Sequence, residues 1–76
     1  MNSLCLYFGE IIRRHRELRA WSQEMLAEKA NLNRSYVGEV ERGKVIPSIL
    51  TLEKLARALD ISMSDLLQQC EQLQSV

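Results

Sequence analysis

The chain has few of the residues that build turn-rich or disulfide-rich folds. Its 76 residues include one proline, three glycines and two cysteines, and only 5% are aromatic. So little proline and glycine leaves few tight turns for a β architecture, so helices are expected. Cys5 and Cys70 lie far apart in the sequence, and His15 is the only histidine. This pattern fits neither a zinc site nor a disulfide framework, so we expect two reduced thiols, no metal and no cofactor.

Long hydrophobic runs and an excess of one charge are also absent. The longest apolar run, residues 4–8, is far shorter than the roughly 18 residues of a membrane span, and no basic flank of a secretory signal precedes it. We therefore expect a cytoplasmic protein with no membrane partner. The net charge of zero argues against a nonspecific nucleic-acid coat.

The charges are nevertheless unevenly distributed. Residues 1–44 hold eight Lys/Arg against six Asp/Glu, whereas residues 45–76 hold two against four. This asymmetry favours contact of the first half with an anion and of the second half with protein. With a single histidine, no plausible carboxylate pair and no phosphate-binding glycine loop, the chain is not expected to be an enzyme or to bind a small molecule.

The apolar residues recur at helical spacing along most of the chain. No repeat or linker interrupts the pattern, so we expect one all-α domain over residues 1–76. The last residue of the first apolar stripe, Leu18, and the first of the fourth, Ile49, are expected to face inward. The five expected helices are residues 7–19, 23–30, 34–42, 48–59 and 62–73.

The third of these helices is short and mostly polar. Asn33 is a suitable N-cap and Gly43 a suitable C-terminal stop, which gives a helix about 13 Å long at 1.5 Å per residue. A helix this short is not stable alone, so its neighbours must hold it and leave its polar face outward. The expected inward residues are Val37, Val40 and Glu41, and the expected outward residues are Ser35, Gly38, Glu39 and Arg42.

The second and third helices together have the form of a helix-turn-helix over residues 22–43. The DNA major groove, roughly 12 Å wide, admits one α-helix, so the outward face of the third helix becomes a candidate reading face. Gly38 costs about 1 kcal/mol relative to alanine within a helix. Its presence makes sense if a side chain there would keep the helix from the bases; the alternative is an exposed glycine that is simply tolerated.

Residues 22–48 read S-Q-E-M-L-A-E-K-A-N-L-N-R-S-Y-V-G-E-V-E-R-G-K-V-I-P-S. This stretch resembles the helix-turn-helix of the Cro and lambda-repressor class of bacterial and phage regulators. The resemblance implies a compact five-helix, lambda-repressor-like fold from Tyr7 to about Leu67. The core N-R-S-Y-V-G-x-V-E-R-G, with the small size of the chain, is most similar to the controller proteins of restriction-modification systems.

The resemblance also implies roles for individual residues, with double-stranded DNA as the partner. The helix N-terminus at Gln23 suits a phosphate, since its free N–H groups carry partial positive charge. Arg34 is suited to guanine and Glu39 to cytosine. The implied base-reading residues are Arg34, Ser35, Tyr36, Gly38 and Glu39. The implied DNA-backbone contacts are Gln23, Arg42, Lys44 and Ser48.

Other positions are expected to be structural. Arg16 and Glu41 match positions in the resembling class at which an ion pair would link the reading helix to the first helix. His15 lies on the apolar stripe and is expected to be a satisfied core or boundary residue. The remaining arginines of the first helix, Arg13, Arg14 and Arg19, are expected to be solvated, with distal phosphate contacts as the alternative.

Specific operators need more than one short helix, so a homodimer on a palindromic site is expected. Leu4 and Leu6 either extend its interface or cover the core. The expected interface residues are Leu50, Met63, Leu66, Cys70 and Leu73. The leading hypothesis is thus a dimeric transcription regulator, with control of a restriction-modification operon as a narrower form. The alternative is a protein-interaction module, such as an antitoxin or antagonist, that keeps the same scaffold.

Overall fold

The computed structural model describes residues 3–74, which form five helices and contain no strand. The all-α prediction is therefore confirmed. The expected helix boundaries agree within one residue, except that the first helix begins at Ser3 rather than at Tyr7. The helices are α1 (Ser3–Leu18), α2 (Gln23–Ala30), α3 (Arg34–Glu41), α4 (Ile49–Leu59) and α5 (Met63–Gln74).

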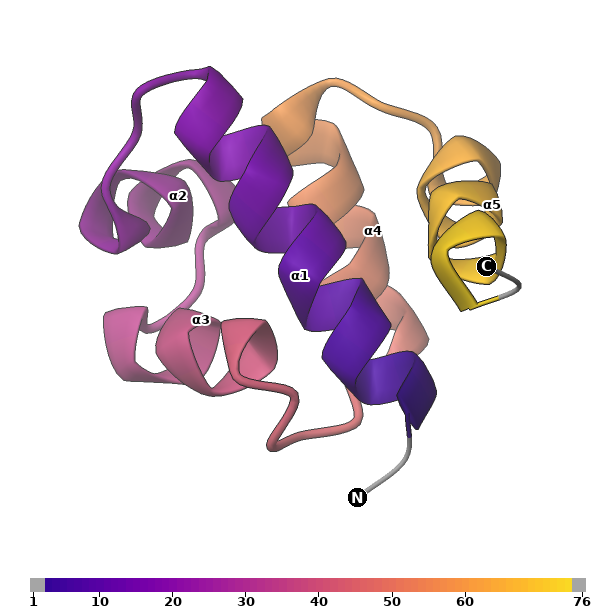
Figure 1. Ribbon diagram of the computed structural model, residues 1–76. Helices are drawn as coiled ribbons and strands as arrows, with labels where there is room; N and C mark the ends of the chain where they lie inside the picture. Colours follow the sequence, from indigo (N-terminus) through magenta and orange to yellow (C-terminus); the bar gives the residue numbers. More distant parts are fainter. Residues whose placement is uncertain (1–2, 75–76) are drawn as a thin grey trace.

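Helix α1 is the centre of the arrangement. It runs across the molecule with α2 and α3 to one side and α5 to the other, as Figure 1 shows. α1 packs against α3, α4 and α5, while α2 packs against α3 and α4. Burial of apolar side chains from all five helices supplies the main stabilising contribution. The fully buried core side chains are Ile12, Leu26, Val37, Val40, Leu55, Leu59, Leu66 and Cys70.

Two residues expected to face inward lie on the surface. Leu18 is 80% exposed and Ile49 is 74% exposed, so both predictions were wrong. Leu18 is the last residue of α1 and Ile49 the first of α4. Helical spacing predicts which face is apolar, but it does not predict where the neighbouring helix stops covering that face.

Four helices end in the same backbone geometry. The residue after the last turn is left-handed at Ala20 (φ 57°), Asn31 (φ 54°), Gly43 (φ 71°) and Asp60 (φ 57°). Each donates its N–H to a carbonyl three residues back, and the next residue donates five back, which is the Schellman motif. Only glycine adopts this conformation without a steric cost, so three of the four ends are strained.

Replacing Ala20 by glycine should therefore stabilise the protein. Ala20 is exposed and left-handed, so removing its Cβ relieves strain that outweighs the added freedom of the unfolded chain. We expect a gain of about 0.5–1 kcal/mol in the free energy of unfolding and a rise of several degrees in Tm. Thermal unfolding followed by circular dichroism measures it. As a control, Gln68→Gly places glycine within the exposed helical backbone of α5 and should destabilise by about 1 kcal/mol; equal effects would contradict the strain at Ala20.

Candidate nucleic-acid interface

Helix α3 lies at the edge of the fold (Figure 1), and its two sides differ in burial. Val37 and Val40 are 0% and 1% exposed and belong to the core. On the other side Arg34 and Ser35 are exposed and Glu39 is half-buried. The predicted division of this helix is confirmed for Val37 and Val40 on the inward side and for Ser35 on the outward side, whereas Glu39, predicted outward, is half-buried.

Local hydrogen bonds set both ends of α3. The side chain of Asn33 accepts a bond from the backbone N–H of Ser35 at 2.8 Å, which satisfies one of the free donors of the first turn. At the other end Gly43 donates to the carbonyl of Val40 and Lys44 donates to that of Glu39. The sequence signals for the start and stop of this helix are therefore confirmed.

A buried ion pair joins α3 to α1. The guanidinium of Arg16 donates from Nε to Glu41 Oε2 at 2.7 Å and from Nη2 to Oε1 at 3.0 Å, and from Nη1 to the carbonyl of Trp21 at 2.8 Å. The two side chains are only 12% and 4% exposed. The hydrogen bond to Glu41 raises the pKa of Arg16, with its burial acting the other way. The predicted ion pair is confirmed, and it fixes the position of α3 on the scaffold.

Gln23 extends this pair to the first residue of α2. Its amide Nε2 donates to Glu41 Oε1 at 3.0 Å, so one carboxylate connects α1, α2 and α3. The side chain is half-buried at the helix N-terminus. A phosphate contact by Gln23 stays a prediction, and in this structure its amide Nε2 donates to Glu41.

Gly38 is covered, although it was expected to be outward and open. A Cβ placed there would lie 3.2 Å from Arg42 Nη1 and 3.6 Å from Gln23 Oε1. The glycine thus leaves room for two polar side chains that lie across α3. Its burial corrects the expectation of an exposed, outward position, because the flexible side chains of Arg42 and Gln23, rather than the core, lie over it.

The other expected contact residues differ in how exposed their side chains are and in whether they already have a partner within the protein. Arg42 and Lys44 are exposed at the C-terminal end of α3. The hydroxyl of Ser48 caps α4, accepting from the backbone N–H of Thr51 at 3.2 Å and lying 3.1 Å from its hydroxyl. Tyr36 is half-buried and packs against the core. Glu39 makes no ion pair among residues 3–74, so its carboxylate is available to a ligand.

Two other arginines of α1 and Arg19, which follows this helix directly, have defined partners. Arg13 and Arg14 form exposed pairs with Glu17 and Glu10, one turn away in each case. Arg19, expected to be solvated, instead donates to the carbonyl of Leu59 at 2.5 Å and so satisfies the C-terminal end of α4.

His15 also has a defined partner, since its Nε2 lies 2.8 Å from Gln69 Oε1 on α5. The expected boundary histidine is confirmed. The partners in the Arg19 and His15 contacts are 40 and 54 residues apart in the sequence. Helical spacing therefore cannot predict either contact.

The five residues expected at a dimer surface do not form one surface. Leu66 and Cys70 are 0% exposed and belong to the core, which corrects that expectation, because no second chain reaches them without unfolding α5. Burial also raises the pKa of the Cys70 thiol to about 11. Met63 and Leu73 are half-buried against the same core, and Leu50 is 68% exposed.

Residues 12–66 match the helix-turn-helix family. This protein belongs to that family. It is 36% identical over 77 residues to the control protein C.BamHI of Bacillus amyloliquefaciens, covering 93% of this chain and 95% of the relative. It is 48% identical over 56 residues to the immunity repressor of Bacillus phage phi105, where it spans only 39% of the relative's length.

Solved structures agree with this assignment. The restriction-modification controller protein C.AhdI of Aeromonas hydrophila is 43% identical, with a TM-score of 0.82 over 86% of this chain and 98% of that one. The clp gene regulator ClgR of Corynebacterium glutamicum reaches a TM-score of 0.89 at 26% identity, over 95% of this chain and 77% of that one. The resemblance to helix-turn-helix regulators, and to the controller proteins among them, is therefore confirmed.

None of the helices within residues 3–74 has the length and hydropathy needed to cross a bilayer. The same residues contain no cluster of three or more His, Cys, Asp or Glu side chains suited to a metal ion.

Proposed function

We propose that this helix-turn-helix protein is a sequence-specific transcription regulator that binds a palindromic operator as a homodimer in the cytoplasm. The observation that carries the proposal is that one side of α3 is held against the fold and the other is exposed. Val37, Val40 and Glu41 hold one side of it to the scaffold, while Arg34 and Ser35 are exposed on the other. A single helix fits the major groove, and two copies on a two-fold site read half-sites about 34 Å apart.

The narrower proposal is control of a restriction-modification operon. Its support is similarity to controller proteins over nearly the full length of C.BamHI and C.AhdI. Neighbouring genes for a nuclease and its methyltransferase, with a reporter fused to their promoter, test this proposal. A promoter whose output is unchanged by the protein would reject it.

Selection of bound DNA from a random duplex pool tests the broader proposal. We expect an enriched palindrome whose half-site centres lie one helical turn apart. Electrophoretic shifts at several salt concentrations then separate specific from nonspecific affinity, because nonspecific binding is mostly electrostatic. A pool with no enriched sequence at any salt concentration would reject sequence-specific binding.

Substitution of two basic residues should have two different effects. Arg34→Ala should cost about 1–3 kcal/mol on the preferred operator and relax preference at one base per half-site, because a bidentate contact to guanine is lost. Lys44→Ala should weaken all sequences alike and lower the salt slope by about one, because a phosphate contact carries no sequence information. Binding titrations on operator and scrambled duplexes measure both effects, with the exposed Arg13→Ala as a control. Identical behaviour of the two variants would contradict the assigned roles.

A second candidate is a protein-interaction module, such as an antitoxin or antagonist. Two observations favour it: the net charge is zero, and Glu39 brings an unpaired carboxylate to the outward side of α3. Glu39→Gln separates the two functions. In a DNA reader it should raise affinity for scrambled DNA and weaken selection at one base, whereas in a protein-binding module it should leave DNA affinity negligible, as in the unmodified chain.

A further inference from the structure

The side chain of Arg42 lies back along α3. Its backbone N–H donates to the carbonyl of Gly38 at 3.1 Å, at the last turn of the helix. A Cβ added at Gly38 would lie 3.2 Å from Nη1 of Arg42 and 3.9 Å from its Cζ. The guanidinium therefore occupies the place where a side chain at position 38 would begin, because helical side chains lean toward the N-terminus of their helix.

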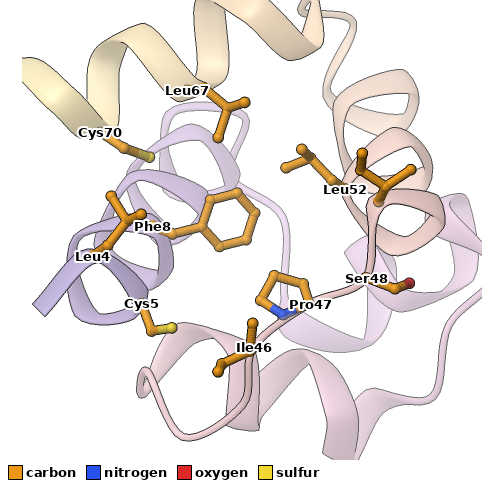
Figure 2. Close-up of a pocket in the computed structure, with 10 residues that line it drawn as sticks. Leu4, Cys5, Phe8, Ile46, Pro47, Ser48, Leu52, Leu67 and Cys70 are labelled. Atoms are coloured by element: carbon orange, nitrogen blue, oxygen red, sulfur yellow. The ribbon is translucent and has the colours of Figure 1, made fainter. Parts of the chain in front are cut away.

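The backbone that carries this side chain is held on both sides. Before Arg42, Glu41 is fixed by its buried ion pair to α1. After it, Gly43 packs so closely on Leu6 that an added Cβ would lie 2.9 Å from the Cα of Leu6. Farther along, Pro47 lines the apolar pocket that Figure 2 shows. The position of the Arg42 backbone is thus fixed, and with it the region that the guanidinium reaches.

Glycine at position 38 provides the space for the guanidinium. Any other residue would bring a Cβ to 3.2 Å from Nη1, closer than an ordinary van der Waals contact, so Arg42 would have to shift. Gln23 Oε1 borders the same space, at 3.6 Å from the added Cβ. The buried Gly38 and the exposed Arg42 therefore act as a pair, in which one residue leaves the space and the other fills it.

The space over Gly38 lies on the side of α3 that carries Arg34. These two residues are four apart in the helix, so they share one side and lie about 6 Å from each other along its axis. In a docked helix-turn-helix the N-terminal residues of the second helix contact the base edges. A side chain from the last turn comes nearer to the bases when it extends back toward that end, as the side chain of Arg42 does.

The chemistry of this place favours a base over a phosphate. Arg42 takes part in none of the ion pairs formed within residues 3–74, and its planar fork of N–H donors matches O6 and N7 of guanine. Glu39 follows Gly38 directly and brings a carboxylate without an ion pair to the outward side of α3. A phosphate there would meet a like charge, whereas the edge of a guanine is neutral.

We propose that Arg42 reads one guanine in each half-site, through the space that Gly38 leaves open on α3. The proposal rests on the DNA-binding function put forward above, and it gives Arg42 a different role from the backbone contact expected from the sequence. The guanine lies in the same half-site as the base read by Arg34. The two bases are about two steps apart, since about 6 Å along the helix compares with 3.4 Å per base-pair step.

Arg42→Lys separates base reading from backbone contact, because lysine keeps the charge but lacks the planar fork. In duplexes selected from a random pool, preference for this guanine should fall at least about tenfold. The salt dependence of binding to scrambled DNA should stay the same, because the number of positive charges is unchanged. Arg13→Lys, a change of the same kind on the far side of the Arg16–Glu41 pair and engaged only with Glu17, is the control and should leave the base profile as in the wild type.

A phosphate contact predicts the opposite pattern. Arg42→Lys would then keep the wild-type base profile, and Arg42→Ala would weaken all sequences alike. This pair of results would overturn the proposal. Thermal unfolding of each variant checks that a change in the profile does not come from loss of the fold.

Operators with 7-deazaguanine, which has a C–H in place of N7, give a second readout. At the guanine assigned to Arg42, the replacement should weaken wild-type binding at least about fivefold but Arg42→Ala binding by less than about twofold, because the contact is already lost. At the base assigned to Arg34, it should weaken both proteins alike. An equal loss in both proteins at the first position would overturn the proposal.

Gly38→Ala tests the part played by the glycine. The added Cβ displaces the guanidinium, so preference for the guanine should fall at least about threefold in a protein that remains fully folded. In the Arg42→Ala background the same substitution should change the profile by less than about twofold. A loss of equal size in both backgrounds would show that Gly38 serves close approach of the helix to DNA rather than the placement of Arg42, and it would overturn the proposal.

The outcomes for Arg42 and for the regulator are distinguishable. A wild-type chain that enriches no sequence would reject sequence-specific binding and this proposal together. An enriched operator with the same base profile in the wild type and in Arg42→Lys would support the regulator and overturn the role of Arg42 alone.

Discussion

Arg16→Met should lower the free energy of unfolding of the protein by about half. Glu41 is 4% exposed and receives two hydrogen bonds from Arg16, so the variant leaves a buried carboxylate without its counter-charge. Breaking one partner of a buried pair costs about 3–5 kcal/mol. A chain of this size has roughly 4–11 kcal/mol in total, at 0.05–0.15 kcal/mol per residue. Urea unfolding followed by circular dichroism measures the loss as a lower midpoint at an unchanged slope.

The double variant Arg16→Met/Glu41→Leu separates the charge from the packing. Replacing both partners by apolar side chains removes the unpaired charge, so we expect it to recover at least half of the lost stability. Arg13→Met, which breaks only the exposed pair with Glu17, should change the free energy of unfolding by less than about 0.5 kcal/mol. A double variant less stable than Arg16→Met would contradict this explanation. It would show that the loss does not come from leaving the Glu41 carboxylate without a counter-charge.

The local features of α3 were predictable because short sequence signals determine them. Asn33 and Gly43 each act within three or four residues through backbone hydrogen bonds, so the sequence alone contains their partners. The three-residue spacing of Val37 and Val40 among polar residues likewise predicts which side of the helix is buried. This part of the candidate site follows from the chain without knowledge of the fold.

Contacts between distant residues were not predictable in this way. The Arg16–Glu41 pair was inferred from a family resemblance, since 25 residues separate the partners and no spacing rule joins them. The choice between Leu66 and Leu67 shows the same limit. They are adjacent in α5, yet Leu66 is 0% and Leu67 is 41% exposed. The packing of α5 on α1 and α4 decides which is buried, and tertiary contacts are not encoded in local periodicity.

Gly9 is a further position that sequence patterns do not reveal. It lies in the middle of α1, where glycine is unfavourable by about 1 kcal/mol relative to alanine. A Cβ there would lie 2.3 Å from the carbonyl oxygen of Val40 and 2.6 Å from that of Glu41. Both atoms are backbone at the end of α3, so they cannot move without moving the helix. Gly9 therefore allows α1 and α3 to pack in direct backbone contact.

Gly9→Ala should therefore destabilise the protein despite the better helix propensity of alanine. Forcing α1 and α3 apart costs about 1–3 kcal/mol or more in strain and lost packing, and it also strains the neighbouring Arg16–Glu41 pair. We expect a net loss of about 2 kcal/mol and a Tm lower by roughly 8–16 °C. Thermal and urea unfolding measure both quantities.

Gly38→Ala is the matched control for Gly9→Ala, because it makes the same change within α3. There the added Cβ meets the ends of two flexible side chains, Arg42 at 3.2 Å and Gln23 at 3.6 Å, so helix propensity should dominate and stability should stay equal or rise by up to about 1 kcal/mol. Opposite signs for the two variants would show that the cost at Gly9 comes from backbone contact rather than from adding a methyl group to a helix. A Gly9→Ala variant as stable as the wild type would mean that α3 is not held against α1 in this way, and the reading helix would then lack the rigid support on which the proposed recognition of DNA depends.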